Sequence, residues 1–248
     1  MRAILTYHSI DPSGSVISVD ESTFRRHAEW LAASLTRVVG IAELLELPPE
    51  EDGVSLVFDD AFENLASVGW PILRDLGLPA TVFVVTGHVG GSNAWGGRDD
   101  PTIPTLPLMS WDSIGRLAEE GLEIGSHTRL HPHLDEVDDA RLEDEVAGAA
   151  ADIEKQLGSR AAGFAYPYGD LDDRAVAAAG SVHEWACTAD LDTLGAGAMP
   201  LRLPRLDAFY YRRPGQLEAW GTTTFRARLS VRRAARDARR WAVGRGLA

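Results

Sequence analysis

The chain has little cysteine, no long hydrophobic run and fewer basic than acidic residues. Cys187 is the only cysteine among 248 residues, which excludes an intramolecular disulfide and a metal site built from several thiolates. No stretch approaches the roughly 18–20 apolar residues that a transmembrane helix needs. The first residues run into a strand-like segment without the features of a signal peptide, so we expect a cytoplasmic location.

The charge of the chain is unevenly distributed, and this bears on its partners. Residues 222–248 contain eight Arg and one Asp, which gives +7, whereas the rest carries 16 basic and 36 acidic residues, which gives −20. Affinity for nucleic acid depends on basic side chains that neutralise phosphates. The acidic body therefore argues against nucleic acid as a partner.

Short apolar, β-rich runs alternate with longer segments of helical periodicity. Such alternation implies an α/β fold with a mostly parallel sheet and helices packed outside it. About seven units favour a closed or nearly closed (β/α) barrel, and no Gly-x-Gly-x-x-Gly motif follows the first strand to support a dinucleotide-binding fold. The expected strands are Arg2–Tyr7, Val54–Phe58, Ala80–Val85, Leu122–Gly125, Ala162–Ala165, Trp185–Thr188 and Leu201–Leu206, and the expected helices are Glu21–Ser34, Ala61–Asp75, Trp111–Glu120, Asp139–Gln156 and Asp172–Ala179.

Chemically reactive side chains follow several of these strands. Asp59 and Asp60 come after the second expected strand, and His127 and His131 come after the fourth. In a parallel barrel the carboxyl ends of all strands lie on one face, where active sites are built. Two imidazoles and one carboxylate suffice to hold a catalytic divalent metal ion, and the second carboxylate is then free to act as a base. The pattern predicts metal-assisted hydrolysis, although an aspartate pair can also be a capping feature and paired histidines can be surface residues.

Three motifs in a fixed order resemble a known family. Val57–Asp60, Ser126–His131 and Tyr166–Gly169 resemble the first three motifs of polysaccharide deacetylases with a NodB-homology domain, and the likeness runs from Tyr7 to about Leu206. The resemblance implies a distorted (β/α) barrel of about seven strands that hydrolyses the acetamido group of an N-acetylated sugar. The chain is most similar to the subgroup with Tyr-His and Tyr-Pro-Tyr-Gly, as in poly-N-acetylglucosamine deacetylases.

The same resemblance implies roles for individual residues. It makes Asp59 the general base and makes the backbone N–H of Tyr168 a hydrogen-bond donor to the oxyanion. It makes Asp60, His127 and His131 the ligands of one divalent metal ion, for which Zn is favoured and Co, Ni or Mn are alternatives. The side chains of Tyr166 and Tyr168 are candidates for substrate contact or for packing in a turn, and we expect His133 to be a neighbour of the ligands rather than a ligand.

Two residues of the family pattern are missing from this chain, so other residues would have to fill their roles. The third motif, read here as Phe164–Tyr166, lacks its opening arginine, and no histidine follows His183 where the family places its general acid. The first and last strands of a closing barrel are neighbours. We therefore predict that His8 protonates the leaving amine or orients the substrate and that Arg205 fixes Asp59. The alternatives are a buried strand-end histidine and a surface arginine.

Two further segments are informative. The long irregular stretch 86–107 is typical of a binding loop, and its Trp95 is a candidate for stacking on a sugar ring or for anchoring the loop. We place a catalytic domain at 1–221 and a basic helical tail at 222–248. The tail alternates apolar and basic residues, so it is expected either to lie on anionic lipid or to dock on the acidic body. The apolar positions are Phe225, Leu229, Ala235 and Trp241, and the basic ones are Arg226, Arg228, Arg232, Arg233, Arg236, Arg239 and Arg240.

The leading hypothesis is a metal-dependent hydrolase that removes acetyl groups from an N-acetylated glycan. One alternative keeps the site and changes the substrate, as in a deformylase or another amidohydrolase. The other is a degenerate domain that binds glycan without turnover, suggested by the missing histidine and arginine.

Overall fold

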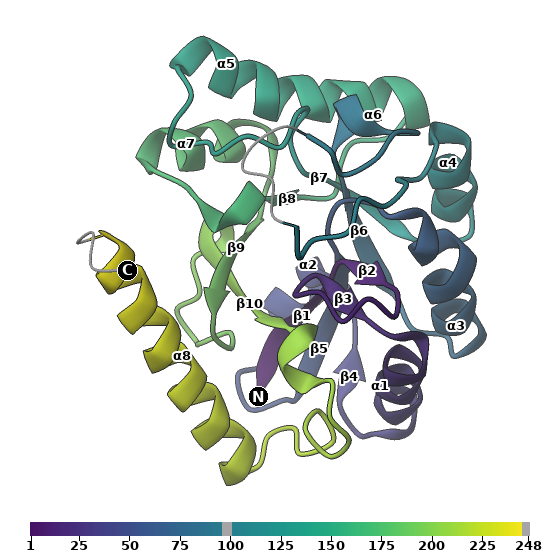
Figure 1. Cartoon of the computed structure of the whole chain (residues 1–248), viewed down its shortest axis with the longest axis vertical. Helices are drawn as coiled ribbons and strands as arrows, with labels where there is room; N and C mark the ends of the chain where they lie inside the picture. The colour runs from purple at the N-terminus through teal and green to yellow at the C-terminus, as the bar shows by residue number, and fades with distance from the viewer. Residues whose placement is uncertain (96–100, 245–248) are drawn as a thin grey trace.

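The computed structural model describes residues 1–95 and 101–244, without the side chains of residue 237 and residues 239–244. Seven parallel strands form a closed barrel (Figure 1). The order around the barrel is β1 (Arg2–Tyr7), β10 (Leu203–Asp207), β9 (Ala186–Leu191), β8 (Phe164–Ala165), β7 (Glu123–Ser126), β6 (Ala80–Val84) and β5 (Gly53–Phe58), which pairs with β1 again. The expected α/β barrel of about seven strands is confirmed.

The pairing of β1 with β5 closes the barrel and is the longest run of paired residues in the sheet. β1 pairs with β5 from Arg2–Gly53 to Tyr7–Phe58, while its other edge pairs with β10 at Leu5–Leu206 and Thr6–Asp207. A two-residue strand, β4 (Arg37–Val38), pairs with the first residues of β5, and β6 pairs with the last residues of β5. Both β1 and β5 are buried along their whole length, as expected of parallel strands covered on both faces.

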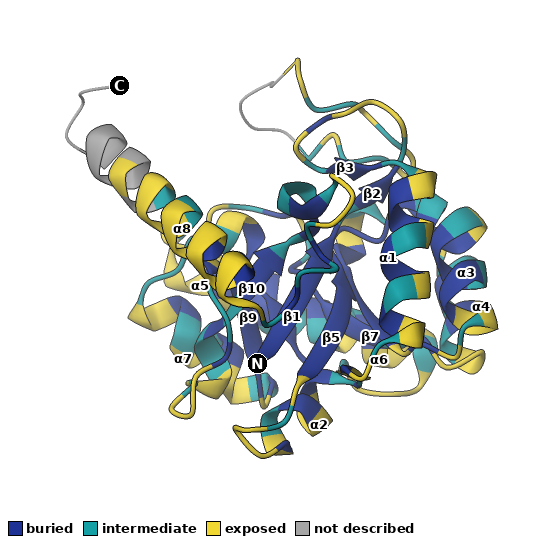
Figure 2. Cartoon of the chain, turned by 90° about the horizontal axis from the view of Figure 1, so that it is seen from below, coloured by how far each residue is buried: buried dark blue, intermediate teal, exposed yellow. Residues whose placement is uncertain are grey.

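One apolar cluster joins residues from six barrel strands with a helix that closes one end of the barrel. The helix α2 (Ile41–Glu46) contributes Ile41 and Leu44 to this cluster. In Figure 1 α2 lies at the centre of the barrel, and in Figure 2 it lies at the end where β1 begins. The strand residues of the cluster are Ile4, Val57, Phe83, Ala165, Cys187 and Leu203. This packing leaves the opposite end, where the strands finish, free to carry the site.

The remaining helices cover the outside of the barrel (Figure 1). Four of them begin at an Asp or Ser whose side chain accepts a hydrogen bond from a backbone N–H of the first turn, the usual N-cap arrangement. Ser110 and Asp138 are two of these N-caps. The helices are α1 (Glu21–Ala33), α3 (Trp70–Asp75), α4 (Trp111–Glu119), α5 (Asp139–Glu143), α6 (Ala149–Leu157) and α7 (Asp173–Val182), with π-helical turns at Leu65–Gly69 and Asp144–Gly148.

The differences from the sequence expectation have local causes. The helix expected to begin at Ala61 begins with the turn at Leu65, because Asp60 and Ala61 have φ of 72° and 58° and cannot belong to a right-handed helix. The strands β2 (Ser9–Ile10), β3 (Ser18–Val19) and β4 were not predicted. Two residues are too few to show an alternating pattern.

The C-terminal helix α8 (Thr223–Gly244) extends over 22 residues. Phe225 and Leu229 are buried against the body of the protein. Among the described residues no helix is both long and apolar enough to cross a lipid bilayer. The division of the chain at residue 221 stays a prediction.

Candidate functional site

Three buried side chains converge at the carboxyl ends of β5 and β7. Nε2 of His127 lies 3.6 Å from Oδ1 of Asp60, and Nε2 of His131 lies 3.5 Å from the same oxygen. The candidate ligand atoms all lie within 4.8 Å of one another. These separations exceed the roughly 2.7–3.2 Å of an ordinary hydrogen bond. They match the separation of about 3.4 Å between two atoms each ~2.1 Å from one tetrahedral ion.

Unsatisfied polar atoms support the same interpretation. Oδ1 of Asp60 is buried and has no hydrogen-bond partner among the described residues, although buried carboxylate oxygens are normally paired. Two of the three residues have left-handed backbones, with φ of 72° at Asp60 and 57° at His131. Strained backbone of this kind collects at functional sites, where the surrounding structure maintains it. The residues present therefore fit a divalent metal ion.

The hydrogen bond of His127 fixes which ring nitrogen faces the site. Nδ1 of His127 lies 2.7 Å from the carbonyl oxygen of Ala165. A carbonyl only accepts, so Nδ1 carries the proton and Nε2 presents its lone pair toward Asp60. This is the usual way in which a second contact orients a metal-binding imidazole.

Burial sets the protonation of the three side chains. It lowers the pKa of His127 to about 4 and lowers the pKa of His131 well below its ordinary value. Both imidazoles are therefore neutral at pH 7, which is the form that binds a metal. Burial also raises the pKa of Asp60 to about 7. A carboxylate that is costly to charge by itself gains most from a cation beside it.

Asp59 has a different environment from its neighbour. The guanidinium Nη1 of Arg205 donates a hydrogen bond of 2.7 Å to Oδ1 of Asp59, and both side chains are buried. Nε2 of His8 lies 3.6 Å from the other carboxylate oxygen. Burial alone would raise the pKa of Asp59, but the charges of Arg205 and His8 hold that pKa well below its usual range. Asp59 is therefore charged at neutral pH.

The seam of the barrel explains how residues 8 and 205 reach Asp59. β1 lies between β5 and β10, so the segment after β1 and the end of β10 flank the end of β5. Nε of Arg205 donates to the carbonyl oxygen of Thr188 at 2.7 Å, which orients the guanidinium. The structure thus brings His8, Arg205 and Asp59 together, and their catalytic roles stay predictions.

Aromatic side chains surround the candidate metal site. The ring of Trp95 stacks on His131 with centroids 4.5 Å apart, and Tyr168 meets His131 edge-on at 4.6 Å. Tyr168 is 45% exposed and has a φ of 58°. His133 stacks on Tyr168 at 4.1 Å and its Nδ1 lies 2.7 Å from Oδ2 of Asp170. His133 is accordingly a neighbour of the site and not one of the grouped ligands.

Tyr166 does not reach the surface of the site. Its side chain is fully buried, packs against Phe164 and donates from its hydroxyl to the carbonyl oxygen of Leu201 at 3.0 Å. Of the two roles considered for Tyr166, the structure gives packing, and the substrate contact is withdrawn. Its ring belongs to a buried apolar cluster that includes Val146 and Ala175.

A buried carboxylate that the sequence did not predict holds the loop that carries the histidines. Oε2 of the buried Glu145 accepts hydrogen bonds from the backbone N–H groups of Arg129, at 3.0 Å, and Leu130, at 2.8 Å. The side chain of Arg129 in turn donates to Asp152. Glu145 sits in the π-helical turn Asp144–Gly148, a feature often found near functional sites. An acidic residue within a helical pattern gave no signal of this contact.

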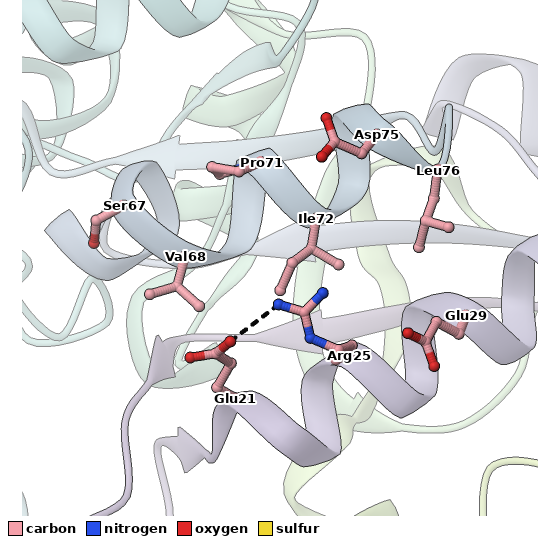
Figure 3. A pocket seen from close by; sticks show the side chains of 9 residues that line it. All are labelled: Glu21, Arg25, Glu29, Ser67, Val68, Pro71, Ile72, Asp75 and Leu76. Atoms are coloured by element: carbon pink, nitrogen blue, oxygen red, sulfur yellow. Dashed lines mark hydrogen bonds and ion pairs between the residues drawn. The ribbon is translucent and has the colours of Figure 1, made fainter.

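A groove on the outer surface is separate from the site. It has a volume of 290 Å³ and lies between α1 and the segment Leu65–Asp75 (Figure 3). Arg25 within the groove is paired with Glu21 at 3.0 Å. The lining residues include none of the site residues, so we assign the groove no role.

The closed parallel barrel, with an Asp-His-His group and a second aspartate at its carboxyl end, is the arrangement of a hydrolase site. A model of the polysaccharide deacetylase family matches residues 46–183, more than half of the chain. The chain belongs to the polysaccharide deacetylase family.

Individual relatives are similar over part of their length. The poly-beta-1,6-N-acetyl-D-glucosamine N-deacetylase of Staphylococcus epidermidis is 25% identical over 169 residues, which is 63% of this chain and 55% of the relative. The Staphylococcus aureus protein of the same name is 26% identical over the same shares. The chain thus spans just over half the length of these relatives.

Solved structures share the fold. The Streptococcus pyogenes deacetylase PplD in complex with acetate has a TM-score of 0.72 at 21% identity, covering 83% of this chain and 91% of that one. IcaB from Ammonifex degensii has a TM-score of 0.71 at 22% identity, covering 89% of this chain and 97% of that one. At these identities the likeness establishes the barrel of NodB-type deacetylases and not the substrate.

Proposed function

We propose that this chain is a metal-dependent N-deacetylase of a polysaccharide or glycan precursor built from N-acetylated sugars. The observation that carries the proposal is the grouping of Asp60, His127 and His131 beside the charged, arginine-paired Asp59. Polymers of β-1,6-linked N-acetylglucosamine are the first substrate to test, because the named relatives act on that polymer. A cytoplasmic location stays a prediction.

In this proposal Asp60, His127 and His131 hold one divalent ion, with Zn favoured. Such an ion polarises an amide carbonyl and lowers the pKa of bound water to about 7. Asp59 accepts the proton of the attacking water as the oxygen of that water bonds to the acetyl carbon. Arg205 keeps Asp59 charged until this step, because the guanidinium holds the pKa of Asp59 low.

The second half of the reaction requires a proton for the departing nitrogen. The C–N bond of the acetamido group breaks, acetate leaves, and the sugar nitrogen gains a proton to become an amine. His8 is partly exposed and lies beside Asp59, so we propose that it supplies this proton. The backbone N–H of Tyr168 is the proposed donor to the oxyanion, and Trp95 with the side chain of Tyr168 forms the proposed aromatic wall for the sugar ring.

Acetate release from β-1,6-linked N-acetylglucosamine oligomers tests the proposal, with chito-oligosaccharides compared in parallel. We expect turnover that is lost on chelation and restored by added Zn. Asp59→Asn should retain the metal and lose ~100- to 10,000-fold in kcat. His127→Ala should lose both metal and activity.

Other results would favour the alternatives. Bound metal without acetate release from any N-acetylated glycan would indicate an amidohydrolase of another substrate, such as a deformylase. Absence of metal together with retained glycan binding would indicate a non-catalytic domain. Chelation that leaves turnover unchanged would refute metal dependence.

A further inference from the structure

Helix α8 contacts the body of the protein through one face. Phe225 and Leu229 are buried, and the guanidinium of Arg232 lies 5.2 Å and 5.3 Å from the ring centroids of Tyr210 and Tyr211. Positions 225, 229 and 232 are spaced so that they share one side of a helix with 3.6 residues per turn. Of the apolar positions predicted for the tail, Phe225 and Leu229 form this docked face, Ala235 is exposed, and the side chain of Trp241 lies outside the described residues.

The face turned away from the body is also apolar. Ala227, Val231, Ala234 and Ala238 are all exposed, and their spacing of four, three and four residues aligns them in a stripe on the opposite side of α8. Val231 is 70% exposed. Figure 2 shows the exposed side of α8 standing away from the barrel. The docked face therefore leaves this outer stripe (Ala227, Val231, Ala234, Ala238) without a partner among the described residues.

Arginines flank the outer stripe on both sides. At 100° per residue Arg226 and Arg233 lie on one side of it and Arg228 on the other, and all three are exposed. Arg233 also pairs with Asp192. The 27 residues from 222 onward carry +7 against −20 for the rest. Exposed arginines thus border the outer stripe on both sides.

We propose that the outer face of α8 binds the surface of an anionic lipid bilayer. A helix with an apolar stripe between cationic borders lies in the interface, with the stripe at the acyl boundary and the arginines among anionic headgroups. A soluble polyanion would use the charges and leave the stripe in water. A second copy of the helix would bring like charges together. The lipid surface is the partner that satisfies both features.

Binding in this way would orient the barrel. In Figure 2, α8 rises toward the side where β1 continues into β2. His8 lies between β1 and β2, so the carboxyl ends of the strands, which carry the site residues, lie on this side. Contact through α8 would hold the site near the lipid plane, where a membrane-assembled glycan would be within reach. The binding itself does not depend on the proposed chemistry.

Co-sedimentation with phosphatidylcholine vesicles, with and without phosphatidylglycerol, tests the proposal directly. Val231→Glu places a charge in the outer stripe. Leu35→Glu is the matched control, because Leu35 is an aliphatic residue at 101% exposure and the charge change is the same. We expect the wild type and Leu35→Glu to pellet with the anionic vesicles, and Val231→Glu to bind about tenfold more weakly, as loss of one buried valine implies. Thermal unfolding of each variant confirms that it is folded.

A second pair of variants separates lipid binding from general charge attraction. Arg226→Gln with Arg228→Gln should weaken binding, whereas Arg37→Gln with Arg160→Gln, which removes the same charge at exposed positions elsewhere, should not. Three results would overturn the proposal: a wild type that does not pellet, an equal loss in Val231→Glu and Leu35→Glu, or full binding of Val231→Glu that soluble polyphosphate competes away. The last of these would indicate a polyanion site instead.

Discussion

Removing the guanidinium beside Asp59 should destabilise the protein and shift its pH dependence. In Arg205→Met the buried carboxylate of Asp59 loses its charged partner, and the carbonyl of Thr188 loses a donor. Breaking a buried ion pair by truncating one partner costs ~3–5 kcal/mol, because the remaining charge stays desolvated. We expect a loss of that size in the free energy of unfolding at pH 7, measured by urea denaturation.

The sign of the pH effect follows from the pKa of Asp59. In the wild type that pKa is depressed in the folded state, so the charged form contributes stability that is present above the unfolded pKa, near 4, and is lost as pH falls through the folded value. In Arg205→Met burial dominates and raises the folded pKa. The variant is then penalised most at neutral pH, and the difference from the wild type should shrink on acidification.

A double-mutant cycle shows whether the effect passes through Asp59. Asp59→Asn in the wild-type and Arg205→Met backgrounds should give a coupling energy of about 2–3 kcal/mol, with metal content held equal. Arg205→Lys should rescue only part of the loss, because one ammonium cannot reproduce the fixed fork that contacts both Asp59 and Thr188. A cost below about 1 kcal/mol for Arg205→Met, with no coupling to Asp59, would refute this reasoning.

Two further predictions concern residues outside the ligand set. Glu145→Leu should weaken metal affinity by ~10- to 100-fold in a chelator competition assay, because the loop before His131 loses both of its carboxylate contacts. Glu145→Gln keeps an oxygen that can accept both hydrogen bonds, so its effect should be smaller. A metal affinity of Glu145→Leu equal to that of the wild type would contradict this prediction. Burial lowers the pKa of His27 to about 4, so it should contribute a loss of about 2 kcal/mol in stability between pH 7 and pH 5, where the unfolded chain takes up the proton first. A His27→Gln variant should show a correspondingly flatter profile over this interval, and an unchanged slope would count against the assignment.

The sequence could predict elements and residues whose signals are local. The seven barrel strands have short, mostly apolar runs, and the polar residues that follow them share one end of the barrel by topology. The contact between Arg205 and Asp59 was predictable because barrel closure makes the first and last strands neighbours. Glu145 was not, since its partners are backbone groups of a loop whose left-handed residues leave no pattern in the sequence. The burial of Tyr166 could not be predicted, because the same turn carries a second tyrosine, Tyr168, and the sequence does not show which of the two is exposed.

The charge balance of the site links these contacts to the proposed chemistry. Asp59 and Arg205 cancel each other, and both imidazole ligands are neutral. Asp60 is then the one ligand with a charge to offer, so that a divalent ion bound as proposed would leave the centre with a net charge of about +1. Such a centre matches the single negative charge that develops on an amide oxygen during attack by water. Without Arg205, a charged Asp59 would cancel the remaining positive charge, and a protonated Asp59 could not accept a proton from water. Arg205 therefore preserves the stabilisation of the oxyanion and also keeps its partner deprotonated.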